Sequence, residues 1–170
     1  MRPLGDRMPP EIAIRRVNAE NVDDLVNLIG ELARFERLPG PDEEAKRRLR
    51  RDALMDPPRF SAFLAYEDGA PIAHIIYFFT YSTFLGKPTL FLEDLFVLEG
   101  HRKEGVGSEL LRYCAEEALR TGCGRMEWTV LTWNSEAIRF YEGFGGKRLD
   151  WYLYRMTESE LRAFGARLKA

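Results

Sequence analysis

Apolar residues recur every three to four positions in several segments of the chain, which is the spacing that gives a helix one apolar face. Asn21 can cap the first of these helices, predicted from Val22 to Arg37. A second helix is predicted from Asp42 to about Leu54, and others over 105–121, 135–142 and 158–168. In the helix over 105–121 the predicted apolar face consists of Val106, Leu110, Leu111, Cys114 and Ala118.

Six other segments alternate apolar and polar residues, or are short apolar runs bounded by turn residues, and these predict strands. Asp68 and Gly69 separate two of them and are typical of a two-residue hairpin turn. Strands and helices follow in the order βααβββαβαβα, which predicts an α/β fold around one mixed sheet. The predicted strands are the segments 11–17, 61–68, 71–81, 89–98, 125–133 and 147–156.

The composition is that of a globular protein. The chain has 170 residues, of which 45% are hydrophobic and 12% aromatic, enough to bury a sizeable core. Residues 1–10 contain arginines but no apolar stretch, so we expect a short mobile tail rather than a signal peptide, and a single domain over 11–170. No apolar run exceeds five residues, whereas a membrane-spanning helix needs about 20. We therefore expect no membrane association and a cytoplasmic location.

Charge and cysteine content exclude other kinds of site. The net charge of −2 gives no field that would attract nucleic acid, so no nucleic-acid partner is expected. The basic run "KRRLRR" (46–51) follows Glu43 and Glu44, which is typical of a salt-bridged helix face in solvent. Cys114 and Cys123 have neither the spacing of a redox pair nor that of a zinc site. We interpret them as buried structural thiols.

The strand predicted over 89–98 leads into a basic loop with two glycines and then a helix. Glycine permits unusual backbone angles, so consecutive amides can point at one anion beside the partial positive charge of a helix N-terminus. Arg102 and Lys103 add charge that suits a diphosphate. The segment lacks the Lys-Ser/Thr of a P-loop and the third glycine of a dinucleotide fingerprint, so neither ATP nor NAD is favoured. On spacing alone, a simple turn at the start of a helix is the alternative.

Several segments carry a resemblance to a known family. "HRKEGVGSELL" resembles the Arg-x-x-Gly-x-Gly loop of the GNAT acetyltransferases, and "WNSEAIRFYEGFG" resembles their downstream Asn and Tyr segment. "FFTYSTFLGKPTLFLEDLFV" and "CGRMEWTVLTWNSEAIRFY" together resemble the spermidine/spermine (diamine) and thialysine acetyltransferase branch. The similarity spans residues 12–156. It implies the GNAT fold, in which helices flank a mixed, mostly antiparallel twisted sheet.

The resemblance also implies where the co-substrate acetyl-CoA binds. In the family, backbone groups of the strand contact the pantetheine arm and the acetyl oxygen, loop amides hold the pyrophosphate, and a later asparagine contacts CoA. Lys103 stands where many family members have glycine, which is a departure from the family loop. The expected acetyl-CoA-binding residues are Leu95, Phe96, Val97, Arg102, Lys103, Gly105, Val106, Gly107, Ser108, Asn134 and Tyr141.

Acyl transfer from a thioester to an amine requires a proton for the departing thiolate. By resemblance, Tyr141 is the family's tyrosine near the CoA sulfur. A phenol, with a reference pKa of about 10, can protonate a thiolate whose thiol has a pKa of about 8.5. A tyrosine packed in the core is the ordinary alternative. Asn134 is suited by residue type to cap a helix, a role that is compatible with a contact to CoA.

Glu93 and Asp94 interrupt the apolar strand. Successive side chains of a strand face opposite sides, so the two acids are not expected to form a carboxylate dyad. A strand bulge or a buried ion pair would account for both. By resemblance, Glu93 binds the cationic amine and relays its proton through water, whereas Asp94 is structural. Unbroken alternation groups Glu93 with Phe91, Leu95 and Val97, and Asp94 with Leu92 and Phe96.

Further residues are expected at the acceptor end. Phe35 and Glu36 match the family's Tyr-Glu pair, and Asp150 and Trp151 resemble an acidic-Trp element beyond the tyrosine. Acids at separated positions suit a long cation. Phe84 replaces a tryptophan common in these relatives, so the family's grip on the carbon chain of the acceptor is not carried over.

Neither histidine belongs to a cluster with metal-ligand spacing, so no metal is predicted. His74 interrupts an apolar strand and is interpreted as a buried core histidine. His101 lies in the basic loop with two glycines over 101–107, called the glycine loop below.

The sequence therefore predicts an acetyl-CoA-dependent N-acetyltransferase that acts by direct transfer in a ternary complex on a small primary amine: a polyamine, a diamine or a lysine-like amino acid. The family habit implies a homodimer. A protein N-terminus or lysine is an alternative acceptor. A third alternative, an acyl-CoA-binding module without turnover, is disfavoured by the presence of Glu93, Tyr141 and the glycine loop.

Overall fold

The computed structural model describes residues 12–167. The chain divides into two compact units, one ending at Thr129 and the other beginning at Val130. The elements in the described range are β1 (Ala13–Arg16), α1 (Val22–Glu36), α2 (Glu43–Leu54), β2 (Ser61–Glu67), β3 (Ala70–Ser82), β4 (Lys87–Val97), the 3-10 helix η1 (Glu99–His101), α3 (Val106–Arg120), β5 (Arg125–Trp128), α4 (Ser135–Gly143) and α5 (Glu158–Arg167).

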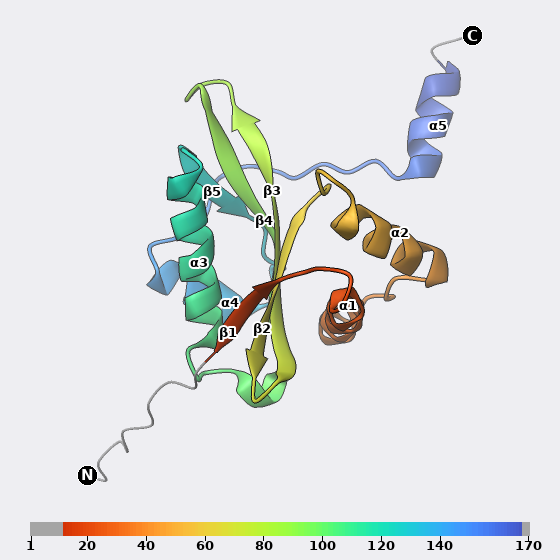
Figure 1. Ribbon diagram of the computed structural model, residues 1–170. Coiled ribbons are helices and arrows are strands. Elements are labelled where there is room, and N and C mark those ends of the chain that lie inside the picture. The colour runs from red at the N-terminus through yellow and green to blue at the C-terminus, as the bar shows by residue number, and fades with distance from the viewer. Residues whose placement is uncertain (1–11, 168–170) are drawn as a thin grey trace. The chain divides into compact units, whose positions relative to one another are not determined.

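The first unit is built on a five-stranded sheet with the order β1-β2-β3-β4-β5. Strands β1 to β4 pair antiparallel with one another, and β5 runs parallel to β4 after the crossover through α3. Helix α1, with α2 packed beside it, lies on one face of the sheet, and α3 covers the other (Figure 1). The predicted α/β fold with a mixed, mostly antiparallel sheet is confirmed.

Each face of this sheet has its own apolar core. On the α1 face, Leu25 and Leu28 pack with Leu64, Ile76 and Phe96 from three strands. Burial of one such side chain stabilises the fold by about 1.5–3 kcal/mol. On the opposite face, the apolar side of α3 is buried as predicted, at Val106, Leu110, Leu111, Cys114 and Ala118.

Several local predictions are confirmed. Helix α1 begins at Val22 after Asn21, although the Asn21 side chain makes no cap bond and its Oδ1 instead accepts from the Asn18 N–H at 2.8 Å. The β2–β3 turn has positive φ at both central residues, 49° at Asp68 and 81° at Gly69, as a two-residue hairpin turn requires.

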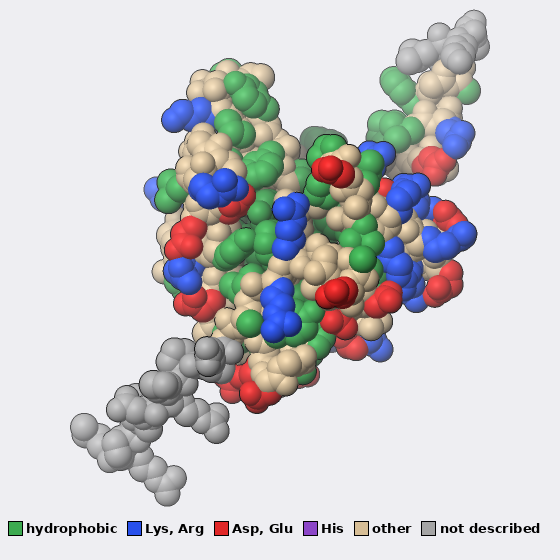
Figure 2. All heavy atoms as spheres, viewed as in Figure 1, with side chains coloured by type: hydrophobic (Ala, Val, Ile, Leu, Met, Phe, Trp, Pro, Cys, Tyr) green, Lys and Arg blue, Asp and Glu red, His purple; other side chains and the backbone are tan. Residues whose placement is uncertain are grey.

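Helix α2 carries the basic run as a solvent-exposed, ion-paired surface. Lys46 Nζ lies 2.7 Å from Glu43 Oε1, Arg48 Nη1 lies 3.2 Å from Glu44 Oε1, and Arg47 also pairs with Glu44. Figure 2 shows the basic and acidic side chains side by side over this helix. The interpretation of this run as a solvated, salt-bridged helix face is therefore confirmed.

Two strand predictions on the C-terminal side need correction. The strand predicted over 147–156 is wrong, because these residues form no strand between α4 and α5. Backbone groups of a strand need a neighbouring strand as hydrogen-bond partner, and among residues 12–167 the sheet ends at β5. The strand predicted over 125–133 is shorter than expected, since β5 ends at Trp128, where its pairing with Leu92 of β4 ends.

The ends of the chain bear on two further predictions. The tail predicted over residues 1–10 lies outside the described residues, and the single domain over 11–170 stays a prediction. Across residues 12–167, none of the helices combines the length and the apolar character needed to cross a membrane.

Candidate active site

A β-bulge shapes β4 at the two acids. Ile76 of β3 pairs with Asp94, whereas the next residue, Tyr77, pairs with Leu92, so Glu93 is the residue that the bulge inserts into β4. A bulge bends its strand and redirects side chains, and bulges are common next to active sites. Glu93 is exposed and Asp94 is half-buried. The bulge that the sequence left as an alternative is therefore present.

The bulge also corrects the predicted grouping of side chains on β4. Asp94 pairs with Ile76, which belongs with Phe96 to the core on the α1 face. Leu92 pairs with Tyr77, whose ring stacks on Phe63, which in turn contacts Tyr113 of α3. Asp94 and Leu92 therefore lie on opposite faces.

The same correction applies to Phe91. It stacks on Phe78, a residue on the α1 side of β3, with ring centroids 5.3 Å apart. Phe91 thus lies on the face of Phe96 and Asp94 rather than with Leu95 and Val97. Unbroken alternation gave the wrong grouping because one inserted residue reverses the faces beyond it.

Beyond the bulge, β4 has an open edge. β5 pairs with β4 only from Thr89 to Leu92, and among the described residues no other strand pairs with that edge. The Leu98 N–H donates to the Ile72 carbonyl of the neighbouring segment at 2.9 Å. Because backbone polar groups of successive residues point to alternate edges, Phe96 directs its groups toward β3, whereas Leu95 and Val97 direct theirs to the open edge.

The glycine loop ends in an N-terminal helix turn suited to an anion. Gly105 is the N-cap of α3 with a φ of 92°, and no side chain caps the helix there. The first N–H groups of a helix have no acceptor within the helix, and in α3 these belong to Val106, Gly107 and Ser108. Lys103 also has a positive φ, of 65°, a conformation that favours glycine. Lys103 thus occupies a backbone conformation that glycine, the residue expected there from the resemblance, would adopt without strain.

Arg102 lies against the end of β4. Its Nε donates to the Val97 carbonyl at 2.9 Å. Its guanidinium carbon lies 4.3 Å from the ring centroid of Phe35 and 5.7 Å from that of Phe96. Cation–π contacts of this kind contribute about 0.5–1 kcal/mol at exposed sites and more when desolvated. Arg102 therefore ties the loop to β4 and to the end of α1, in addition to its predicted role as a phosphate ligand.

His101 ties the other side of the loop to the β2–β3 hairpin. Its Nδ1 lies 2.7 Å from Oε2 of Glu67 at the end of β2. Glu104 completes a group whose possible ligand atoms lie within 4.8 Å of one another, the one group of this kind in the described range. The absence of a metal site stays a prediction.

The end of α1 brings one acidic side chain, Glu36, to the α1 face of β4. The Phe35 ring lies 6.3 Å from that of Phe96. Glu36, the last residue of α1, is half-buried, and its pKa is raised, first by burial and then by the negative charge of Asp94. Two carboxyl groups, Glu36 and Asp94, therefore share this region, together with the predicted acceptor residue Phe35.

Sequence reasoning had assigned Asp94 a structural role and missed this neighbourhood. It also missed His74, whose Nε2 lies 3.8 Å from Asp94 Oδ2. Glu36, His74 and Asp94 belong to three elements far apart in the sequence. No local pattern in the sequence marks such a neighbourhood.

The second unit contains the remaining predicted site residues. Asn134 is the N-cap of α4, and its Oδ1 accepts from the Ala137 N–H at 3.1 Å, as predicted. Tyr141 lies in the last turn of α4, half-buried, with its ring 5.2 Å from that of Phe140. Asp150 and Trp151 are exposed in the segment between α4 and α5.

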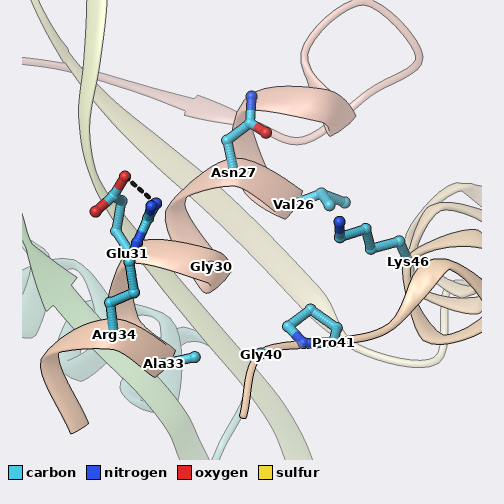
Figure 3. Close-up of a pocket in the computed structure, with 9 residues that line it drawn as sticks. All are labelled: Val26, Asn27, Gly30, Glu31, Ala33, Arg34, Gly40, Pro41 and Lys46. Atoms are coloured by element: carbon cyan, nitrogen blue, oxygen red, sulfur yellow. Dashed lines mark hydrogen bonds and ion pairs between the residues drawn. The ribbon is translucent and has the colours of Figure 1, made fainter. Parts of the chain in front are cut away.

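A surface hollow lies between α1 and α2 of the first unit. Figure 3 shows it, with Glu31 and Arg34 of α1 paired at one side. None of the predicted site residues lines it. Its lining consists of Val26, Asn27, Gly30, Glu31, Ala33, Arg34, Gly40, Pro41 and Lys46.

Comparison with known proteins places the chain in a family. The model of the acetyltransferase (GNAT) family matches residues 24–145. The chain is 30% identical over 166 residues to thialysine N-epsilon-acetyltransferase of Mus musculus, covering 91% of this chain and 97% of that protein. It is also 30% identical over 159 residues to spermidine/spermine N(1)-acetyltransferase-like protein 1 of Homo sapiens, covering 87% of this chain and 23% of that protein.

Solved structures share the fold. An integron cassette protein from V. cholerae superposes with a TM-score of 0.79 at 23% identity, covering 93% of this chain and 98% of that one. The acetyltransferase AAC(6')-Iy, in complex with a bisubstrate analogue containing CoA, superposes with a TM-score of 0.70 at 20% identity, covering 87% and 99%. The family model spans well over half of the sequence, and the similarity to the murine enzyme extends over almost all of it. The chain is an acyltransferase and belongs to the GNAT family of acetyltransferases.

Proposed function

We propose that this acetyltransferase transfers the acetyl group of acetyl-CoA to a primary amine of a small cationic acceptor: a polyamine, a diamine or a lysine-like amino acid. The observation that carries this proposal is the acidic neighbourhood of β4, where Glu36 and Asp94 share one face and Glu93 occupies the bulge. The similarity to enzymes named for thialysine and for spermidine/spermine supports the same class of acceptor.

The acetyl-CoA site is formed by backbone groups as well as by charged side chains. The first turn of α3 offers the amides of Val106, Gly107 and Ser108 to the pyrophosphate of acetyl-CoA, with the helix N-terminus contributing its partial positive charge. Lys103 and the remaining donors of Arg102 add cationic contacts. The open edge of β4 offers the backbone groups of Leu95 and the N–H of Val97 to the pantetheine arm. Phe96, whose backbone is directed to β3, contributes its ring to the core instead.

The acceptor end is selective for positive charge. A cation about 4 Å from one carboxylate gains about 1 kcal/mol in water and about 4 kcal/mol at the effective dielectric of a protein surface. Like-charge repulsion between Glu36 and Asp94 is relieved when a cation lies between them. An acceptor with a second amino group can place one nitrogen here while the other reacts. Phe35, Asp150 and Trp151 are the further residues that we assign to the acceptor.

The chemistry is direct transfer in a ternary complex. The amine nitrogen attacks the thioester carbonyl, the C–N bond forms and the C–S bond breaks. Glu93 holds the ammonium and passes its proton to water, and the Tyr141 phenol protonates the departing thiolate. Asn134 contacts CoA from the start of α4 while it caps that helix.

We further propose that the protein works as a homodimer in the cytoplasm, without a nucleic-acid or membrane partner. Side chains on the segment between α4 and α5 support a protein partner, because Leu149, Trp151, Leu153 and Tyr154 are all exposed. Several large apolar side chains exposed in one segment are uncommon on monomers and are typical of interaction sites.

A panel of acceptors tests the proposed activity. Release of the CoA thiol from acetyl-CoA is measured with a diamine, a polyamine, lysine, a monoamine of matched length and a lysine-containing peptide. We expect the highest kcat/KM with a dicationic acceptor and a clear loss with the monoamine. Glu36→Gln should raise the KM of the diamine more than that of the monoamine. Turnover confined to the peptide would contradict the small-amine assignment, and tight CoA binding without any turnover would contradict the enzymatic one.

A further inference from the structure

His74 is a polar residue in an apolar position. It lies in the middle of β3 and is fully buried, between Leu64 of β2 and Phe96 of β4 in the sheet register. Its ring lies 5.8 Å from that of Phe96. Among the described residues, neither ring nitrogen has a hydrogen-bond partner. An imidazole carries at least one N–H in every protonation state, so this position lowers stability relative to a phenyl ring of similar size.

One carboxylate lies almost within reach of this imidazole. His74 Nε2 and Asp94 Oδ2 are 3.8 Å apart, whereas an N–H···O hydrogen bond spans about 2.7–3.2 Å. The Asp94 side chain is 24% exposed, in contrast to 0% for His74. Asp94 thus connects the buried imidazole to the surface, and a rotation that moves its carboxylate by about 1 Å would complete the hydrogen bond.

The acidic group beside Asp94 indicates what this hydrogen bond would serve. Glu36 lies at the end of α1, and the negative charge of Asp94 contributes to its raised pKa. The Arg102 guanidinium lies over the nearby Phe96 ring, with its carbon 5.7 Å from the ring centroid. Asp94 is thus the member of the acidic pair in contact with β3, and its two oxygens can serve two partners.

We propose that His74 is a positioning residue for the acceptor: its Nε2–H donates to one oxygen of Asp94 and so directs the other oxygen toward the cationic amine beside Glu36. This inference rests on the proposed function for the identity of the ligand. The hydrogen bond closes when the cation draws the two carboxylates together, because the ammonium then neutralises their repulsion. His74 touches neither the amine nor acetyl-CoA in this arrangement. No proton is transferred through it, and its effect reaches the acceptor only through Asp94.

Substitutions at His74 separate this role from core packing. His74→Phe keeps an aromatic ring and removes both unpartnered nitrogens, so the melting temperature should stay equal or rise. The KM of the diamine should nevertheless rise about tenfold, with the KM of acetyl-CoA unchanged, because a hydrogen bond to a charged group is lost. His74→Gln keeps a donor and should recover part of the loss. In an Asp94→Asn background, His74→Phe should add little further loss.

A histidine that only fills the core gives a different result, namely a more stable His74→Phe variant with an unchanged KM for the diamine. That result would overturn the inference. A second readout does not depend on turnover. The chain has two histidines, so His74→Phe assigns the nitrogen signals in a spectrum of protein with ¹⁵N-labelled histidine. Adding the diamine to the CoA complex should move the His74 Nε2 signal toward that of a hydrogen-bonded N–H.

The two readouts also separate the failure of this inference from the failure of the proposed function. A wild-type protein that acetylates no amine in the panel would contradict the proposed function. The His74–Asp94 contact would then be judged from the labelled protein alone. With CoA and the diamine present, His74 signals that are the same in wild type and Asp94→Asn would overturn it, and signals that differ only for the nitrogen facing Asp94 would support it.

Discussion

The left-handed backbone of Lys103 gives a prediction whose size follows from the structure. Lys103 has a φ of 65°. A non-glycine residue in this region destabilises the folded state by about 1–2 kcal/mol. Glycine removes that strain, but its unfolded chain is more flexible, which lowers folding stability by about 0.5–1 kcal/mol. Lys103→Gly should therefore stabilise the fold by up to about 1.5 kcal/mol. For a chain of this length, each kcal/mol raises Tm by about 2–4 °C.

Gly105→Ala is the matched control, for which the opposite shift in Tm is expected. The φ of Gly105 is 92°, and a Cβ added there would meet no atom within 4 Å. Gly105→Ala therefore introduces backbone strain without a clash, and Tm should fall where it rises for Lys103→Gly. Thermal unfolding of both variants in the absence of ligand measures the two shifts.

Substitutions of Lys103 distinguish the effect of its backbone strain from the effect of its charge. Lys103→Asn tolerates the left-handed conformation and removes the ammonium. If Lys103 contacts the pyrophosphate, both Lys103→Asn and Lys103→Gly should weaken CoA binding several-fold in calorimetry, although neither destabilises the fold. A fall in Tm for Lys103→Gly would refute the strain reasoning, and unchanged CoA affinity in both variants would refute the phosphate contact.

Three further predictions concern single side chains. The raised pKa of Glu36 means that its ionised form is disfavoured in the folded state, so stability is lost as the pH rises from its ordinary value of 4.5 through the higher folded value. Glu36→Gln should therefore match wild type in urea unfolding near pH 4 and exceed it near pH 7; a constant difference at both pH values would contradict this. Burial raises the pKa of the Cys114 thiol to about 12, so native protein at pH 8 should be alkylated only at the half-buried Cys123, and denatured protein at both cysteines. Tyr141→Phe should lower kcat about 100-fold or more, whereas the exposed Tyr152→Phe should leave kcat unchanged; equal kcat in the two variants would remove Tyr141 from its role as acid.

The helices and the hairpin could be predicted because their information is local. The apolar face of α3 consists of five residues at helical spacing, and all five are buried. The hairpin turn follows from the backbone preferences of Asp68 and Gly69 alone. In both cases the local structure is determined by residues that are close together in the sequence.

The bulge, the missing strand and the acidic neighbourhood depend on contacts between distant segments. Two adjacent acids in β4 gave no sign of which one was inserted, so the faces of Leu92 and Phe91 were misassigned. The segment 147–156 has strand-like alternation, but alternation does not supply a neighbouring strand. Only the fold brings Glu36 at the end of α1 to Asp94, so sequence reasoning placed Glu36 at the acceptor end by resemblance and left Asp94 out.

The central claim is that this chain moves an acetyl group from acetyl-CoA to the amine of a small dication. Its most direct test is identification of the product by mass spectrometry after incubation of the purified protein with acetyl-CoA and a diamine, with the monoamine of matched length as control. The expected product is the monoacetylated diamine, formed with one equivalent of free CoA and at a much higher rate than the acetylated monoamine. Free CoA released without any acetylated amine, or equal rates for the diamine and the monoamine, would contradict it.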